Sequence, residues 1–137
     1  MASIYATAVF YQGSGVLIRG PSGSGKSDLA IRLIEDGANL IADDYVRIDT
    51  AGNKILLSPP KNIAGLIEGR GIGVINMESI KDVPLRVIFD LKPISSINRM
   101  PENLTEIIEG ISIPVVEISA FECSVLSKIK IFLRTMK

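Results

Sequence analysis

Short apolar runs separated by turn-forming residues recur along the whole chain. Runs of four to eight residues rich in Ile, Val and Leu, bounded by Gly, Pro, Asn or Asp, are typical of β-strands. They predict strands within residues 4–11, 16–18, 40–42, 74–75, 87–89 and 113–118. Between residues 46 and 57 apolar and polar positions alternate around an Ala-Gly-Asn turn, which predicts a β-hairpin.

Helices are expected where apolar residues recur every three or four positions. Leu29, Ala30, Leu33 and Ile34 share one helical face, and Gly37 is well placed to end that helix. A second apolar stripe covers residues 125–133, and short helices are expected at residues 63–67 and 102–109. The order of elements predicts an α/β fold, in which a mixed sheet with flanking helices carries a strand–loop–helix unit near its start.

The composition fits one domain, so residues 1–137 are expected to fold together, with 47% hydrophobic residues to form the core. Fifteen basic and fifteen acidic residues cancel, which gives no electrostatic reason to expect nucleic-acid binding. No stretch has the pattern of a signal peptide or the apolar length of a membrane span. With a single cysteine as well, we expect a soluble cytoplasmic protein.

The strongest motif follows the second predicted strand and has the spacing G-x-x-x-x-G-K-[ST]. Its residues are Gly20, Pro21, Ser22, Gly23, Ser24, Gly25, Lys26 and Ser27. Glycines let backbone N–H groups point into one concavity that holds phosphate oxygens, and the following helix adds its positive end. Lys26 is expected to reach the β- and γ-phosphates of ATP, and the Ser27 hydroxyl to ligate Mg²⁺. A flexible Gly/Ser turn is the alternative.

Asp43 and Asp44 end the third apolar strand, at the carboxyl edge where ligands gather in open α/β sheets. The chain contains no histidine, so acid–base chemistry falls to carboxylates and any metal is a hard cation held by oxygen. One aspartate is expected to hold Mg²⁺ or its waters, and the other to accept a proton from an attacking hydroxyl. An ordinary acidic turn is the alternative.

A third segment, Glu-Gly-Arg-Gly-Ile-Gly, begins at Glu68. It offers a carboxylate, a permanent cation in Arg70, and glycines that allow a ligand to approach the backbone closely. An arginine near a transferring phosphoryl group stabilises the charge that develops there. The alternative is a glycine-rich loop with a surface ion pair.

Together these segments resemble the catalytic domain of bacterial HPr kinase/phosphorylase. The matching stretches are GVLIRGPSGSGKSDLAIRLIEDGANLIADD, residues 15–44, and LIEGRGIGVIN, residues 66–76, with weaker similarity through Arg99 to the final helix. The chain is similar to the short form that lacks a separate N-terminal domain. The resemblance implies an ATP- and Mg²⁺-dependent kinase that phosphorylates a serine of HPr, the phosphocarrier protein of the sugar phosphotransferase system. It also implies phosphorolysis of phospho-HPr in many members, and a hexamer.

By the same resemblance, Lys26 and Ser27 contact the phosphates and Mg²⁺, and Glu68 is the second Mg²⁺ ligand. Asp44 corresponds to the general base of the kinase direction. Arg99 corresponds to a catalytic arginine, and Arg70 belongs to the signature segment.

Two departures from the family pattern weigh against phosphorolysis. Tyr5 occupies the position of a family histidine, and a phenol with a pKa of about 10 does not replace an imidazole near neutrality. Residues 119–124 lack the basic residues of a loop that longer members use in dephosphorylation. A regulatory module that binds nucleotide without catalysis, and a P-loop enzyme acting on a small molecule, are the alternatives. The basic final helix is either a solvated face or a docking surface.

Overall fold

The computed structural model describes residues 2–62 and 64–136, and its centre is a parallel pair of strands, β3 (Ser14–Arg19) and β9 (Val83–Leu91). Nine strands join in one curled sheet, whose main path runs β1-β5-β6-β9-β3-β2-β4. The other elements are β1 (Ala2–Tyr5), β2 (Thr7–Tyr11), α1 (Lys26–Glu35), β4 (Asn39–Ala42), β5 (Tyr45–Ala51), β6 (Lys54–Ser58), β7 (Leu66–Gly69), β8 (Gly73–Asn76), the 3-10 helix η1 (Ile94–Ser96), β10 (Leu104–Ile108), β11 (Ile111–Ile118) and α2 (Val125–Thr135).

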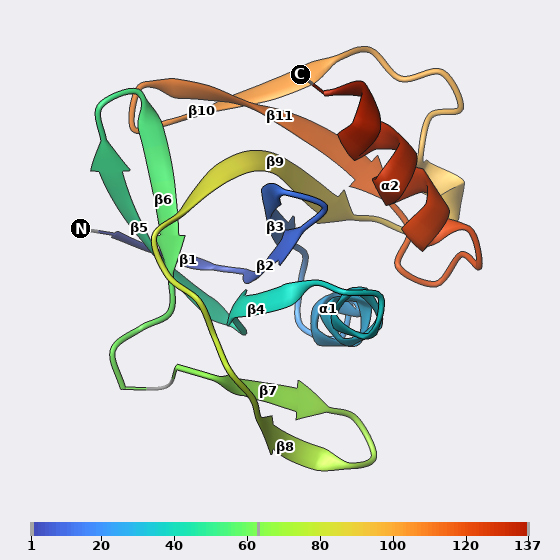
Figure 1. The fold of residues 1–137 in the computed structure, drawn as a ribbon. Coiled ribbons are helices and arrows are strands. Elements are labelled where there is room, and N and C mark those ends of the chain that lie inside the picture. The colour runs from blue at the N-terminus through green and yellow to red at the C-terminus, as the bar shows by residue number, and fades with distance from the viewer. Residues whose placement is uncertain (1, 63, 137) are drawn as a thin grey trace.

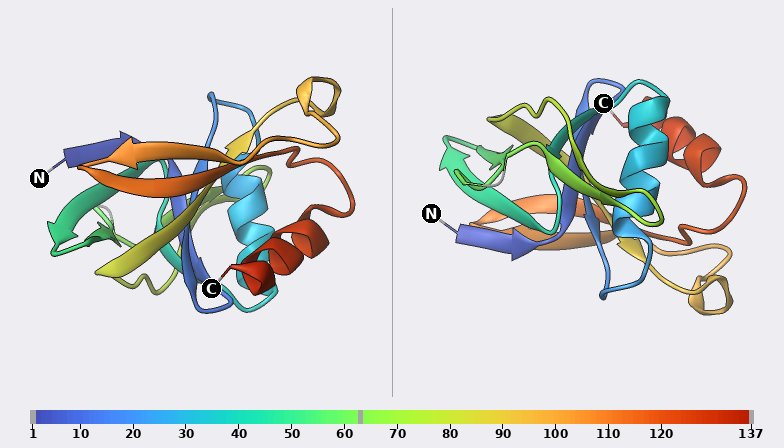
Figure 2. Two further views of the ribbon diagram at one scale, coloured as in Figure 1. Left: turned by 90° about the horizontal axis from the view of Figure 1, so that it is seen from above. Right: turned by 90° about the horizontal axis from the view of Figure 1, so that it is seen from below.

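The central strands are buried on both faces because their side chains alternate between two apolar clusters. Val16 and Ile18 of β3 pack with the apolar faces of α1 and α2, whereas Leu17 packs with the curled β5–β6 side of the sheet. The two helices therefore lie together on one face of the sheet, as Figure 2 shows. The predicted α/β class, with a mixed sheet and flanking helices, is confirmed.

The pairing of β2 sets where the functional edge lies. It is antiparallel to both β3 and β4, and Thr7 pairs with Ile18 while Ala8 pairs with Ala42. The carboxyl ends of β3 and β4 therefore meet beside the start of β2. The loop after β3 and the aspartates after β4 share this edge, as the sequence predicted.

β7 and β8 form a separate two-stranded sheet, and Figure 1 shows this hairpin standing apart from the larger sheet, beyond β4 and α1. The short helix predicted at residues 63–67 is wrong for Leu66 and Ile67, which belong to β7. Ile63 lies outside the described residues.

The helix predicted at residues 102–109 is also wrong, since Leu104–Ile108 form β10. Glu109 and Gly110 both have positive φ, at 48° and 78°, and they join β10 to β11 as a two-residue hairpin turn. Arg19 on β3 helps to hold this strand in the sheet, because its guanidinium donates to Asp90 on β9 and, at 2.8 Å, to Glu106 on β10. These non-local contacts outweigh local helix propensity.

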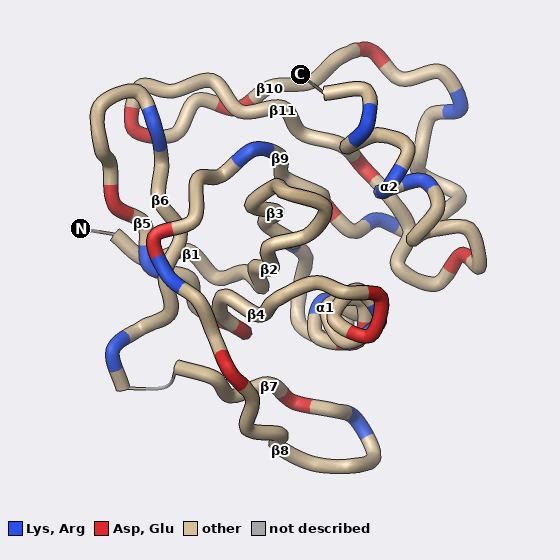
Figure 3. The backbone as a smooth tube through the Cα atoms, viewed as in Figure 1, with Lys and Arg blue, Asp and Glu red and all other residues tan. Residues whose placement is uncertain are grey.

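The final helix is basic, as predicted, and Figure 3 shows its Lys and Arg positions along α2. The Nζ atom of Lys128 lies 2.8 Å from Oε1 of Glu122, and the Nζ atom of Lys130 lies 2.8 Å from Oδ2 of Asp36. Ion pairs within the chain therefore balance part of the positive charge of α2. Among the described residues no helix has the length and apolar character needed to cross a bilayer.

Candidate active site

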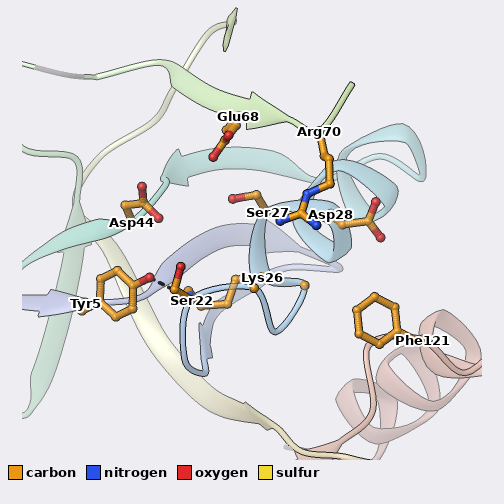
Figure 4. Close-up of a pocket in the computed structure, with 11 residues that line it drawn as sticks. Tyr5, Ser22, Lys26, Ser27, Asp28, Asp44, Glu68, Arg70 and Phe121 are labelled. Atoms are coloured by element: carbon orange, nitrogen blue, oxygen red, sulfur yellow. Dashed lines mark hydrogen bonds between the residues drawn. The ribbon is translucent and has the colours of Figure 1, made fainter. Parts of the chain in front are cut away.

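A cavity of about 260 Å³ opens at the edge where β3 and β4 end, and it brings together segments that are far apart in the sequence. Figure 4 shows its walls: the loop and first turn of α1 in the middle, the β7–β8 hairpin above, Asp44 and Tyr5 at one end, and Phe121 at the other. The lining residues are Tyr5, Ser22, Gly23, Gly25, Lys26, Ser27, Asp28, Asp44, Glu68, Arg70 and Phe121.

The loop between β3 and α1 depends on its glycines. Gly23 and Gly25 have φ of 83° and 100°, in the left-handed region that other residues rarely adopt. At Gly20 a Cβ would lie 2.4 Å from the Ser24 hydroxyl oxygen, so a side chain there would collide with the loop. Gly25 caps α1 without any side-chain hydrogen bond, which leaves the positive end of the helix at the cavity available to an anion.

Lys26 is 5% exposed, yet its ammonium group is well supplied with partners. Its Nζ donates to the carbonyl oxygens of Gly20 at 2.8 Å and Pro21 at 3.2 Å, and to the Tyr5 hydroxyl at 3.3 Å. It also lies 4.4 Å from the centroid of the Tyr5 ring, within the range of a cation–π interaction. Lys26 thus places a positive charge, already oriented, at the Tyr5 end of the cavity.

Asp43 lies behind the cavity and accepts three hydrogen bonds. Oδ1 accepts from Ser27 Oγ at 2.7 Å and from Thr7 Oγ1 at 2.8 Å, and Oδ2 accepts from the Glu68 backbone N–H at 3.2 Å. Because its oxygens are engaged in this way, Asp43 acts as a brace between β2, α1 and β7. It orients the Ser27 hydroxyl so that the oxygen lone pairs remain free for a ligand.

Asp44 has a different environment from its neighbour. Its φ of 70° turns the chain sharply, and its side chain lines the cavity. The pKa of Asp44 is raised above its ordinary value, chiefly by partial burial and then by the negative charge of Asp43. Lys26 opposes this shift, and Glu68 adds to it. A carboxyl that lines a cavity and has a raised pKa is suited to accept a proton.

Glu68 ends the exposed face of β7, and Arg70 follows in the turn to β8. In Figure 4 both side chains point down from this hairpin toward the loop, and Arg70 approaches Ser27 and Asp28. The hairpin thus contributes one carboxylate and one cation to the wall opposite the loop.

The predicted Mg²⁺ would need oxygen donors that face the cavity. In the part of the chain that the structure describes, no three His, Cys, Asp or Glu residues are grouped to hold a metal by themselves. Mg²⁺ does not need such a group, since it keeps several waters and binds through one or two protein oxygens plus substrate phosphates. The Ser27 hydroxyl, held by Asp43, and the Glu68 carboxylate are oxygen donors facing one cavity, so the residues fit this ion.

Most of the predicted site residues meet here, and their roles stay predictions. Gly20 and Pro21 contribute carbonyl oxygens to Lys26, and the buried Ser24 hydroxyl has no hydrogen-bond partner among the residues that the structure describes. Arg99 lies apart: it is exposed after η1 and does not line the cavity.

Sequence reasoning missed three residues of the site: Thr7, Phe121 and Asp28, the last of which lines the cavity in the first turn of α1. Thr7 is fully buried and holds Asp43, and its only signal was a hydroxyl within an apolar strand. Phe121 lines the cavity, and its signal was an aromatic residue within the polar segment before α2.

Comparison with known proteins gives consistent matches. The family model described as "HPr Serine kinase C-terminal domain" matches residues 2–129. The HPr kinase/phosphorylase of Clostridium tetani is 38% identical over 94 residues, covering 69% of this chain and 30% of that protein. The protein of the same name from Chlorobium phaeobacteroides is 32% identical over 132 residues, covering 85% of this chain and 40% of its own length. The chain thus spans well under half of these relatives.

Among solved structures, the Hpr(Ser) kinase/phosphatase from Coxiella burnetii superimposes with a TM-score of 0.88 at 24% sequence identity. The alignment covers 98% of this chain and 89% of that one. The two chains share one fold.

Proposed function

The chain belongs to the HPr serine kinase C-terminal domain family, and from this premise we propose that it transfers the γ-phosphoryl group of ATP to a serine of an HPr-like phosphocarrier protein. The observation that carries the proposal is the convergence of Lys26, Ser27, Asp44 and Glu68 on one cavity from three separate segments, the start of α1, the turn after β4 and β7. Cation, hydroxyl and carboxylates at a helix N-terminus are the parts that phosphoryl transfer requires.

The loop and the start of α1 hold the triphosphate in this scheme. Backbone N–H groups at the uncapped helix end neutralise phosphate oxygens, and Lys26 offsets the charge of the β- and γ-phosphates. Bound Mg²⁺ would be held by Ser27 and Glu68 and would neutralise charge on the phosphate oxygens. Asp43 keeps the Ser27 hydroxyl oriented.

Asp44 is the proposed general base. As the serine oxygen of the acceptor forms its bond to the γ-phosphorus, its proton passes to the Asp44 carboxylate, and the bond from the γ-phosphorus to the β-bridging oxygen breaks to release ADP. The raised pKa of Asp44 makes it a better proton acceptor than an ordinary aspartate, provided that it is ionised when the acceptor arrives.

The proposal covers the kinase direction only. The relatives are named kinase/phosphorylase. Tyr5, whose hydroxyl accepts from Lys26, stands at the position where the resemblance to the family implies a histidine. A phenol near neutrality neither carries a positive charge nor acts readily as a base. Tyr5 also supports the alternative of a nucleotide-binding regulatory module, which the following experiment separates from the kinase.

The experiment measures ADP release from Mg·ATP with and without an HPr-like phosphocarrier protein. We expect release to depend on the acceptor and to fall about 10²-fold or more in Asp44→Ala, because a general base contributes roughly 10²–10⁴-fold. Lys26→Ala should also abolish it. Lys54→Ala and Asp49→Ala, which alter the same residue types outside the cavity, serve as matched controls.

Two results would contradict the proposal in different ways, and a third would invalidate the comparison of variants. ADP release that needs no acceptor would indicate an ATPase or a small-molecule kinase. ATP binding without any ADP release would indicate the regulatory module. Loss of activity in the control variants would show that the assay reports on folding rather than on the site.

A further inference from the structure

Phe121 occupies the end of the cavity opposite Tyr5 and Asp44, as Figure 4 shows. The ring is 73% exposed, although the residues before it, Ser119 and Ala120, are buried. The ring lies close to the loop, since a Cβ built on Gly25 would be only 3.0 Å from Cζ of the ring. An exposed aromatic residue alone is unremarkable on a protein surface, but this one lies directly against the loop that precedes α1.

The backbone next to Phe121 is anchored. The Arg32 guanidinium, on α1, donates a hydrogen bond to the Ala120 carbonyl oxygen, and Ala120 itself packs into the cluster beneath the helices. Arg32 is in turn paired with Asp28 at 3.2 Å. The segment carrying Phe121 is thus tied to the helix whose N-terminus faces the cavity, so the ring is presented at a defined place.

The direction of a bound nucleotide follows from the proposed chemistry. The γ-phosphate must lie at the Asp44 end, where the base acts, and the β-phosphate must lie near Lys26. The remainder of the nucleotide then extends past the first turn of α1, toward Asp28 and Phe121. Of the two aromatic residues that line the cavity, Phe121 is the one at this far end.

We infer that Phe121 is the stacking platform for the nucleobase of the bound nucleoside triphosphate, an inference that rests on the proposed function. The chemistry is that of a flat apolar ring against a flat heteroaromatic one. A phenyl face carries no donor or acceptor that reads a base edge, and aromatic stacking is tolerant of base identity. The site therefore binds ATP and GTP with similar affinity. The contact with the base adds binding free energy to that of the contacts with the phosphates.

The test is binding calorimetry with Mg²⁺, using ATP, GTP and inorganic tripolyphosphate as probes. Phe121→Ala should weaken ATP and GTP binding by roughly 10- to 100-fold, the usual range for loss of one base–aromatic stack, and leave tripolyphosphate binding unchanged. Phe121→Trp should keep both nucleotide affinities. Phe121→Leu, which keeps an apolar side chain against Gly25 without the ring, should fall between alanine and wild type.

Ile131→Ala removes another exposed apolar side chain, on α2 and outside the cavity, and should change none of the three affinities. Wild-type ATP affinity in Phe121→Ala would overturn the inference. So would an equal loss of ATP and tripolyphosphate binding, since that would mean that the ring acts through the loop. In both cases the phosphate site would stand. Failure of the wild-type chain to bind either ATP or tripolyphosphate would instead refute the proposed function together with the inference.

Discussion

At the scale of single residues, the adjacent aspartates have separate tasks. Asp43 accepts hydrogen bonds from Ser27, Thr7 and the Glu68 backbone, which commits its oxygens to structure. Asp44 follows in a left-handed turn and faces the cavity. One carboxylate thus holds the Ser27 hydroxyl, and the next is the one that we propose as the general base. A reversal of the two roles would leave the proposed base locked in hydrogen bonds.

The pH behaviour of Asp44 gives a prediction at this scale. Its pKa is raised by burial and by Asp43, with a further contribution from Glu68, so its proton is lost at a higher pH than from an ordinary aspartate. If Asp44 must be ionised, the rate of phosphoryl transfer should decrease as the pH falls through this raised pKa. The decrease should therefore occur at a higher pH than the ordinary pKa of aspartate.

Titration of the side-chain carboxyl by ¹³C NMR measures this pKa without reference to activity. Glu68→Gln removes one of the two negative charges and should lower the pKa of Asp44. Asp44 titrating at or below the ordinary value, or unmoved by Glu68→Gln, would contradict the assignment.

Motifs in the sequence predicted most of the residues of the candidate site, but not all of them. The spacing from Gly20 to Ser27 and the paired aspartates identified residues whose chemistry is local to a motif. Thr7 and Phe121 belong to no motif, and they reach the site only through the pairing of β2 and the packing of Ala120. A hydroxyl in an apolar strand and an aromatic residue in a polar segment are local signals, but they do not say which distant residues these side chains contact.

At the scale of elements, a three-residue link joins the two helices to the sheet. Tyr11 on β2 donates to Asp36, at the end of α1, at 2.5 Å, and Lys130 on α2 lies 2.8 Å from the same carboxylate. Lys130 and then Tyr11 hold the pKa of Asp36 below its ordinary value, while burial and Asp36 raise the pKa of Tyr11. The link helps to seat α2, and with it the segment that carries Phe121.

Asp36→Asn should destabilise the protein at neutral pH, because it removes the charge and keeps the shape. A depressed folded-state pKa means that the stabilisation is present above the ordinary aspartate pKa and is lost as the pH falls through the folded value. The gap between wild type and variant in urea-unfolding free energy should therefore close on acidification.

Asp28→Asn on the same helix is the matched control, since Asp28 makes only an exposed pair with Arg32 and should cost little. A gap that stays constant with pH, or that the control reproduces, would argue against the link.

The strand β10, which the sequence predicted as a helix, shows where the prediction of elements fails. Residues 104–108 contain Leu, Thr, Glu and Ile in an order that fits a short helix or a strand equally well. The decision comes from β11, which supplies five paired positions, and from Arg19, which binds Glu106. The Glu-Gly turn at residues 109–110 was the local signal that favoured a hairpin.

At the scale of the whole molecule, the sheet brings Tyr5, Lys26, Asp44, Glu68 and Phe121 to one cavity although 116 positions separate the first from the last. The α/β class and the positions of most strands along the chain followed from apolar periodicity. The curl of the sheet, which folds β5 and β6 over one face, did not, because it arises from pairing between distant strands.

We propose that this cavity moves a phosphoryl group from ATP to a protein serine. The most direct measurement is intact-mass and fragment-ion spectrometry of an HPr-like phosphocarrier protein after incubation with the chain and Mg·ATP. We expect the addition of one phosphoryl group, located on a serine, and its absence with Asp44→Ala. An acceptor of unchanged mass under conditions where ATP is bound, or a phosphoryl group on a residue other than serine, would contradict it.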